Sequence, residues 1–106
     1  MFVRILKMKL KPNEDKGLTR AVDQEIIPIL KKFAGFAGEF TLVSKDKKEA
    51  LGVTLWERQE NFETYDHEES ANVLKILGNY IEGKPAPQVY DVTHSTVETF
   101  PVRKAA

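Results

Sequence analysis

Cysteine is absent from this chain of 106 residues, and histidine is scarce. Without cysteine the chain forms no disulfide framework, thiolate nucleophile or zinc ribbon, and this composition is compatible with a reducing cytosol. The two histidines, His67 and His94, are isolated and do not have metal-ligand spacing. We therefore expect a cytoplasmic protein without a metal site.

An excess of charge of either sign is also lacking, because 16 basic and 16 acidic residues cancel and are interspersed. This pattern provides no basic stripe for nucleic acid and no cationic face for an anionic membrane. No segment approaches the ~20 apolar residues of a membrane span, and charges interrupt the apolar start of the chain, unlike in a secretory signal. We expect a small molecule or a protein as partner, with no nucleic acid and no membrane.

Familiar catalytic motifs are missing as well. The sequence contains no Ser/His/Asp order, phosphate-binding glycine loop or paired-carboxylate motif, so hydrolase, kinase and nucleotide-dependent functions receive little support. The length lies in the range of one domain, and we expect residues 1–106 to form a single domain around one modest core.

The first half of the chain shows strand and helix patterns in turn. Apolar residues at period two predict a strand over 2–10, and helical spacing from Leu18 to Phe33 predicts a helix. Pro28 removes a backbone donor inside that helix, which predicts a kink or a restart near Ile27. Two more strands are expected to form a hairpin, over residues 39–44 and 51–56.

The second half is expected to complete an α+β fold. A helix begins after the third strand, breaks near His67 and resumes at Val73, and residues 83–87 form a loop. The final extended stretch covers 88–100. The order strand, helix, strand, strand, helix, strand is the ferredoxin-like split βαβ arrangement, an antiparallel sheet with two helices on one face.

Both faces of several strands carry apolar groups, whereas two helices cover only one face. A bare face of this kind would be a large exposed patch unless a second copy covered it. We therefore expect a homodimer in which the two sheets form one barrel.

Three segments carry a resemblance to a known family: Gly35-Phe36-Ala37-Gly38-Glu39-Phe40, Thr54-Leu55-Trp56-Glu57-Arg58 and Asn61-Phe62-Glu63-Thr64-Tyr65. Together they resemble antibiotic biosynthesis monooxygenase-like (ABM) proteins of the dimeric α+β barrel superfamily, over nearly the whole chain. The resemblance implies a cavity between sheet and helices. Characterised members use this cavity for cofactor-free oxygenation of quinol-like or polycyclic phenols, for haem degradation or for isomerisation of small metabolites.

The haem-degrading branch of that family has an Asn on the first strand, a Trp in the second helix region and a His about one helix later. This chain has no Asn on the first strand, and it has Tyr65 and Lys75 near the other two positions. We therefore expect no haem at an axial histidine and no cofactor.

Two residues are the candidates for catalysis. His94 shares a strand face with Tyr90 and is a candidate acid/base group for proton abstraction from a phenol; the alternative is a hydrogen-bonded sheet histidine. Trp56 can stack on a flat substrate, or it can fill the core with its N–H satisfied. We expect both to contribute to one pocket.

Four further residues are candidates for substrate binding. Tyr65 and Phe36 are expected as cavity wall or core. His67 is expected at a cavity lid or in solvent, and Arg4 is expected to hold an anionic oxygen or to lie exposed at a strand end.

Three functions remain compatible with these residues. The first is a cofactor-independent monooxygenase acting on a small aromatic quinol or polycyclic phenol, in which the deprotonated substrate supplies the electrons. The second is an isomerase of a small oxo or lactone metabolite. The third is a non-enzymatic ligand-binding barrel.

Overall fold

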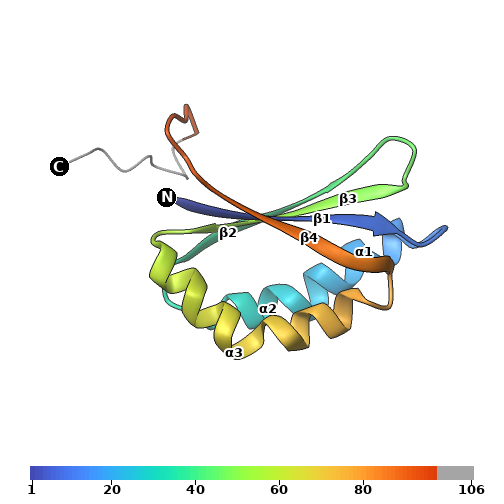
Figure 1. Cartoon of the computed structure of the whole chain (residues 1–106), viewed down its shortest axis with the longest axis horizontal. Coiled ribbons are helices and arrows are strands. Elements are labelled where there is room, and N and C mark those ends of the chain that lie inside the picture. Colours follow the sequence, from blue (N-terminus) through green and yellow to red (C-terminus); the bar gives the residue numbers. More distant parts are fainter. Residues whose placement is uncertain (98–106) are drawn as a thin grey trace.

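The computed structural model describes residues 1–97, which fold into one antiparallel sheet covered by helices (Figure 1). The sheet has the strand order β2-β3-β1-β4. Its strands are β1 (Phe2–Leu10), β2 (Phe36–Val43), β3 (Glu49–Trp56) and β4 (Ile81–Asp91). β1 pairs antiparallel with both β3 and β4, and β2 pairs antiparallel with β3. The expected α+β ferredoxin-like fold is confirmed, with the final strand at the sheet edge beside the first.

The first helical segment is interrupted at the position where the sequence predicts a kink or a restart. α1 (Asp15–Ala21) runs into a wider π-helical turn, η1 (Val22–Ile26), and the helix restarts as α2 (Ile27–Leu30). Pro28 follows that turn and lacks the N–H that a continuous α-helix would use. The expected restart at Ile27 is confirmed.

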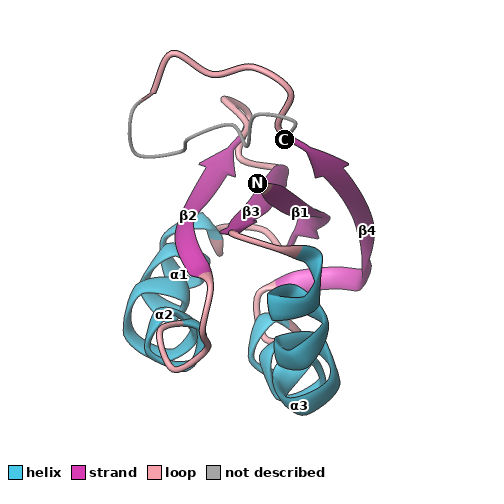
Figure 2. Cartoon of the chain, turned by 90° about the vertical axis from the view of Figure 1, so that its left-hand side faces the viewer, coloured by secondary structure: helices cyan, strands magenta, loops and turns pink. Residues whose placement is uncertain are grey.

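The helices cover one face of the sheet and leave the other face bare of helices (Figure 2). α3 (Gln59–Leu77) lies beside the α1–α2 segment beneath the sheet. Trp56, Leu18 and Leu30 are the largest fully buried side chains, and they lie in the core between these layers. Burial of apolar side chains between the sheet and the helices provides the main stabilisation of the fold.

The prediction that the second helix breaks near His67 is wrong, because α3 is continuous from Gln59 to Leu77. Its buried face carries Tyr65 and Val73 eight residues apart, just over two helical turns. The position between them on that face is Glu69, which is half-buried. The gap in the apolar pattern is therefore a polar patch on a continuous helix.

The prediction of a loop over residues 83–87 is also wrong, because β4 begins at Ile81 and includes these residues. β4 is an edge strand and pairs on one side only. Proline has no backbone N–H to donate, and it is tolerated in such a strand because the other side needs no ladder hydrogen bonds. Gly83 adopts a φ of +68° near the point where the β1–β4 register shifts. The strand ends at Asp91 rather than continuing to residue 100, and residues 98–100 lie outside the described part.

No helix within 1–97 is long and apolar enough to cross a membrane. Over the same range, no group of three or more His, Cys, Asp or Glu side chains is arranged to hold a metal ion.

Candidate functional site

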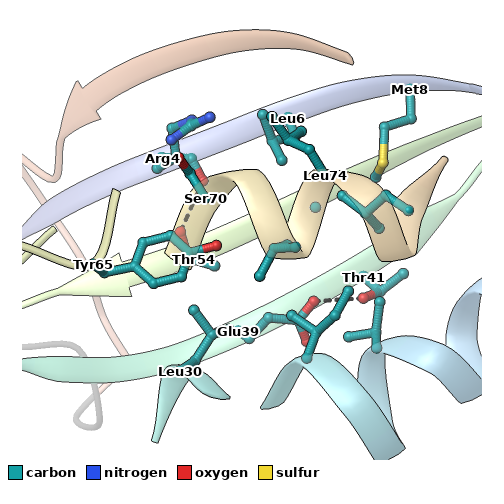
Figure 3. Close-up of a pocket in the computed structure, with 15 residues that line it drawn as sticks. Arg4, Leu6, Met8, Leu30, Glu39, Thr41, Thr54, Tyr65, Ser70 and Leu74 are labelled. Atoms are coloured by element: carbon teal, nitrogen blue, oxygen red, sulfur yellow. Dashed lines mark hydrogen bonds between the residues drawn. The ribbon is translucent and has the colours of Figure 1, made fainter. Parts of the chain in front are cut away.

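A cavity of about 50 Å³ lies between the sheet and the helices (Figure 3). Its walls are mainly apolar, and its polar residues are few and come from different strands and from α3. The lining residues are Arg4, Leu6, Met8, Val22, Ile26, Leu30, Glu39, Thr41, Gly52, Thr54, Tyr65, Ser70, Val73, Leu74 and Leu77. An apolar concavity with a few placed polar groups is the usual form of a small-molecule site.

Pairing of the strands places a polar row across the cavity floor. Thr54 on β3 lies opposite Glu39 on β2 and opposite Arg4 on β1. In the next row Gly52 lies opposite Thr41 and Leu6, and its lack of a side chain leaves space at the middle of the floor. The sheet therefore presents a carboxylate and a guanidinium to the same cavity, separated by one strand.

Arg4 is held at one end of the cavity. Its Nη1 lies 3.5 Å from Oδ1 of Asp66, and its guanidinium lies 4.9 Å from the centre of the Phe62 ring, a cation–π contact. Only 13% of the side chain is exposed. Within the described residues, Nε of Arg4 is buried without a hydrogen-bond partner. A buried donor without a partner is costly, which sets Arg4 apart from a side chain whose donors are all satisfied.

Tyr65 enters the cavity from α3 near Arg4 (Figure 3). Burial raises the pKa of Tyr65 to about 12, and the nearby Arg4 guanidinium partly opposes this shift. The phenol is therefore neutral at physiological pH and remains a hydrogen-bond donor. Ser70, on the next turn of α3, lines the same cavity but donates its hydroxyl to the Asp66 carbonyl.

Trp56 and Phe36 form an aromatic cluster beside the cavity. Trp56 is fully buried, stacks on Tyr65 with ring centres 5.3 Å apart, and meets Phe36 edge-on at 5.5 Å. Its Nε1 donates to Oγ1 of Thr54 at 3.1 Å, and that hydroxyl donates to the Arg4 carbonyl at 3.5 Å. Trp56 thus packs against the Tyr65 ring and holds the Thr54 hydroxyl by a hydrogen bond.

The two histidines lie away from the cavity. His94 is exposed three residues beyond the end of β4, and His67 is exposed on α3. Neither residue lines the cavity, and the structure does not bring His94 and Trp56 together in one pocket. Arg4 and Tyr65, two of the residues predicted to bind substrate, both line the cavity. Catalytic roles for His94 and Trp56 stay predictions without geometric support.

Glu39 and Thr41 line the cavity although neither was predicted as a site residue. Thr41 donates its hydroxyl to Oε2 of Glu39, and both line the cavity. Burial raises the pKa of Glu39, and the bond from Thr41 partly opposes this. The available signal was the alternation of β2, which places Glu39 and Thr41 on one face and Phe40 and Leu42 on the other. Because both faces of the sheet carry apolar residues, that alternation did not reveal which face the helices cover.

The sheet order and the helices on one face place the chain among the α+β ferredoxin-like folds. A scan of protein-family models and a search of curated proteins gave no significant match. Solved structures do match over nearly the whole chain. A monooxygenase of Streptomyces coelicolor, solved with the ligand nanaomycin D, is similar with a TM-score of 0.78 and 15% identity, covering 91% of this chain and 90% of that one.

Two further structures show the same architecture. A cofactor-independent oxygenase of Streptomyces nogalater has a TM-score of 0.72 at 9% identity, covering 92% of this chain and 97% of the other. A Bacillus cereus protein, provisionally assigned as an antibiotic biosynthesis monooxygenase, has a TM-score of 0.71 at 21% identity, covering 91% and 96%. The resemblance to antibiotic biosynthesis monooxygenases is confirmed at the level of the fold.

Proposed function

We propose that this protein is a cofactor-independent monooxygenase-like enzyme that acts on a small aromatic quinol or polycyclic phenol in the cavity. The observation that carries the proposal is the buried Arg4 side chain, whose Nε has no hydrogen-bond partner and which lines a mainly apolar cavity together with the neutral phenol of Tyr65. The shared fold with two oxygenases supports the reaction class.

Arg4 and Tyr65 would bind the oxygen of the deprotonated substrate. A guanidinium attracts the phenolate, and a neutral phenol donates a hydrogen bond to it, so both groups favour the ionised form. The ionised substrate is electron-rich and can pass an electron to dioxygen. Arg4 would thus supply charge stabilisation, and the apolar wall would exclude water.

A ring-sized substrate needs more room than the cavity of about 50 Å³ provides. Ligand sites of drug-sized molecules usually hold about 300 Å³ or more. Leu74 lines the cavity and is 40% exposed, so its rotation would open the cavity toward solvent. We propose that entry involves movement of Leu74 and separation of α3 from the α1–α2 segment.

The small volume favours a second candidate, an isomerase of a small oxo metabolite. Such a reaction needs a proton shuttle and an anion-stabilising group but no oxygen. The same Arg4 end would then bind an enolate. Oxygen uptake separates the two candidates, because the isomerase consumes none.

We also propose that two copies associate through the helix-free face of the sheet. Strand alternation places Phe40, Leu42 and Tyr90 on that face, with exposed fractions of 43%, 51% and 52%. Sedimentation equilibrium should give twice the chain mass. Leu42→Arg should give a monomer, whereas the control Ala71→Arg, at an exposed position of α3, should remain dimeric.

The enzymatic proposal is tested with an oxygen electrode and dihydroxyanthrone as the probe. Chelator-treated protein should consume oxygen and form the quinone in equal amounts. Conversion of the probe without oxygen would support the isomerase instead, and binding without conversion would support a non-enzymatic barrel.

A further inference from the structure

Glu39 lies at the boundary between the central cavity and a second, outer groove. The groove has a volume of about 540 Å³ and runs along α1 and η1. Glu39, Thr41 and Val22 line both spaces. Glu39 is thus placed to meet a molecule in the cavity on one side and solvent in the groove on the other.

The surroundings of Glu39 are polar on the groove side and apolar on the cavity side. The charged groups of α1 and η1 that line the groove with it are Asp15, Lys16, Arg20 and Asp23. On the cavity side the facing groups are Arg4 of β1 and Tyr65 of α3. Among the described residues no cationic side chain lies within ion-pair distance of Glu39, and its one side-chain hydrogen bond comes from Thr41.

This carboxylate is therefore not occupied by a structural ion pair. Desolvation raises its pKa, which brings the carboxylate closer to the basicity that proton abstraction requires. Within residues 1–97, Glu39 is also the single carboxylate that lines the cavity. Asp66, in contrast, pairs with Arg4.

We propose that Glu39 is the general base of this site, taking a proton from the substrate in the cavity and exchanging it with solvent through the outer groove. The proposal rests on the proposed function. Thr41 would position the carboxylate through its hydrogen bond. Glu39 and Arg4 stand two strand spacings apart, about 10 Å between Cα atoms, so a fused-ring substrate laid across Thr54 would reach both.

The steps balance for an anthrone and dioxygen. Glu39 takes one proton from the methylene carbon, and the carbanion passes one electron to dioxygen. The two radicals combine to form a carbon–oxygen bond, and the peroxide anion takes a proton back from Glu39. Loss of the second methylene proton and cleavage of the O–O bond then give the carbonyl group, while the released hydroxide and that proton form water.

The test begins without oxygen, so that proton abstraction is measured apart from oxygenation. Dihydroxyanthrone is mixed anaerobically with the wild-type protein, and the absorbance of its anion is recorded. The matched variants are Glu39→Gln, which keeps the shape but cannot accept a proton, and Glu39→Asp. The control is Glu68→Gln, an exposed position of α3 outside the cavity.

The anion should form in the wild type and in Glu68→Gln. Glu39→Gln should bind the probe with unchanged affinity for the neutral form and form the anion about 100-fold more slowly. Glu39→Asp should recover part of the rate and provides the comparison if Glu39→Gln fails to fold. The wild-type rate should fall as pH falls through the pKa of Glu39, which lies above the ordinary glutamate value.

Three results would overturn a claim, and each is distinct. Equal anion formation in Glu39→Gln and wild type would overturn the role of Glu39. If the wild type forms the anion normally but takes up no oxygen after air is admitted, the proposed monooxygenase function is overturned. The role of Glu39 as general base is then still supported. Absence of probe binding to the wild type would overturn both.

Discussion

Arg4 and Glu39 lie on the same face of the sheet, on strands either side of β3, and both are paired in register with Thr54. This relationship gives the cavity a cationic end and an acidic end at a fixed separation. An aromatic substrate would be oriented by its charge distribution, with its ionised oxygen at Arg4. The aromatic cluster around Trp56 fixes the cationic end, because Thr54 bonds to both Trp56 and the Arg4 backbone.

Replacing Arg4 should weaken binding of the ionised substrate specifically. Arg4→Gln removes the charge, and a hydrogen bond to a charged group contributes about 1.5–3 kcal/mol, which corresponds to a loss of about tenfold or more in affinity. Affinity for dihydroxyanthrone is measured by fluorescence titration at a pH where the free probe is ionised. Arg58→Gln, at an exposed position before α3, is the control and should bind normally. Equal affinity in both variants would exclude Arg4 from the site.

Filling the cavity floor should block binding without disturbing the fold. A Cβ at Gly52 would lie 3.4 Å from the flexible Cε of Met8 and 4.0 Å from Cβ of Leu6, so a small side chain is accommodated at the position that leaves the floor open. Gly52→Val should lower affinity for dihydroxyanthrone by about tenfold or more, as expected from overpacking of about 1–3 kcal/mol in the bound state. Gly52→Ala should have a smaller effect. Full affinity in Gly52→Val would show that the probe binds elsewhere.

Tyr65 should make the stability of the protein depend on pH in the alkaline range. Burial raises the pKa of Tyr65 from 10.0 to about 12, so the folded state retains a proton that the unfolded chain releases. Its contribution is complete below pH 10 and is lost as pH rises through about 12. Denaturant unfolding at increasing pH should show this decline, and Tyr65→Phe should reduce it. An unchanged decline in Tyr65→Phe would assign it to other groups.

Gly35 should be required by the fold rather than by the chemistry. Its φ is +80°, and a Cβ there would come within 2.2 Å of the Asn61 side chain. Gly83 also has a positive φ, +68°, but a Cβ there would meet nothing within 4 Å. Gly83→Ala should therefore lower the free energy of unfolding only by the conformational cost, about 1–2 kcal/mol. Gly35→Ala should lower the free energy of unfolding by more. Denaturant unfolding of the two variants measures the difference, and equal losses would contradict the packing argument.

The architecture was predicted well from the sequence, because the spacing of apolar residues along the chain distinguishes strands from helices. The first strand, the hairpin and the helix restart at Ile27 all follow from neighbouring residues. β4 was harder, because its prolines exclude a central strand but are tolerated at an edge, and only the strand order reveals the edge. The continuous α3 was missed because Glu69 interrupts its apolar face.

The candidate site was predictable in part. Arg4 and Tyr65 were chosen from the sequence, and the structure places them together at the cavity. Glu39 was missed because the sequence does not show which face of β2 the helices cover. His94 was chosen because histidine is a common acid/base residue, but its position beyond the end of β4 depends on where the strand stops, and the local pattern does not determine that.

Oxygen uptake by chelator-treated wild-type protein with dihydroxyanthrone, measured beside Gly52→Val, tests most directly whether the cavity is the substrate site of an oxygenase. Uptake should be proportional to wild-type protein concentration, equimolar with the quinone formed, and strongly reduced in Gly52→Val. Uptake no faster than in buffer alone, or uptake of equal rate in both proteins, would contradict a substrate site in this cavity.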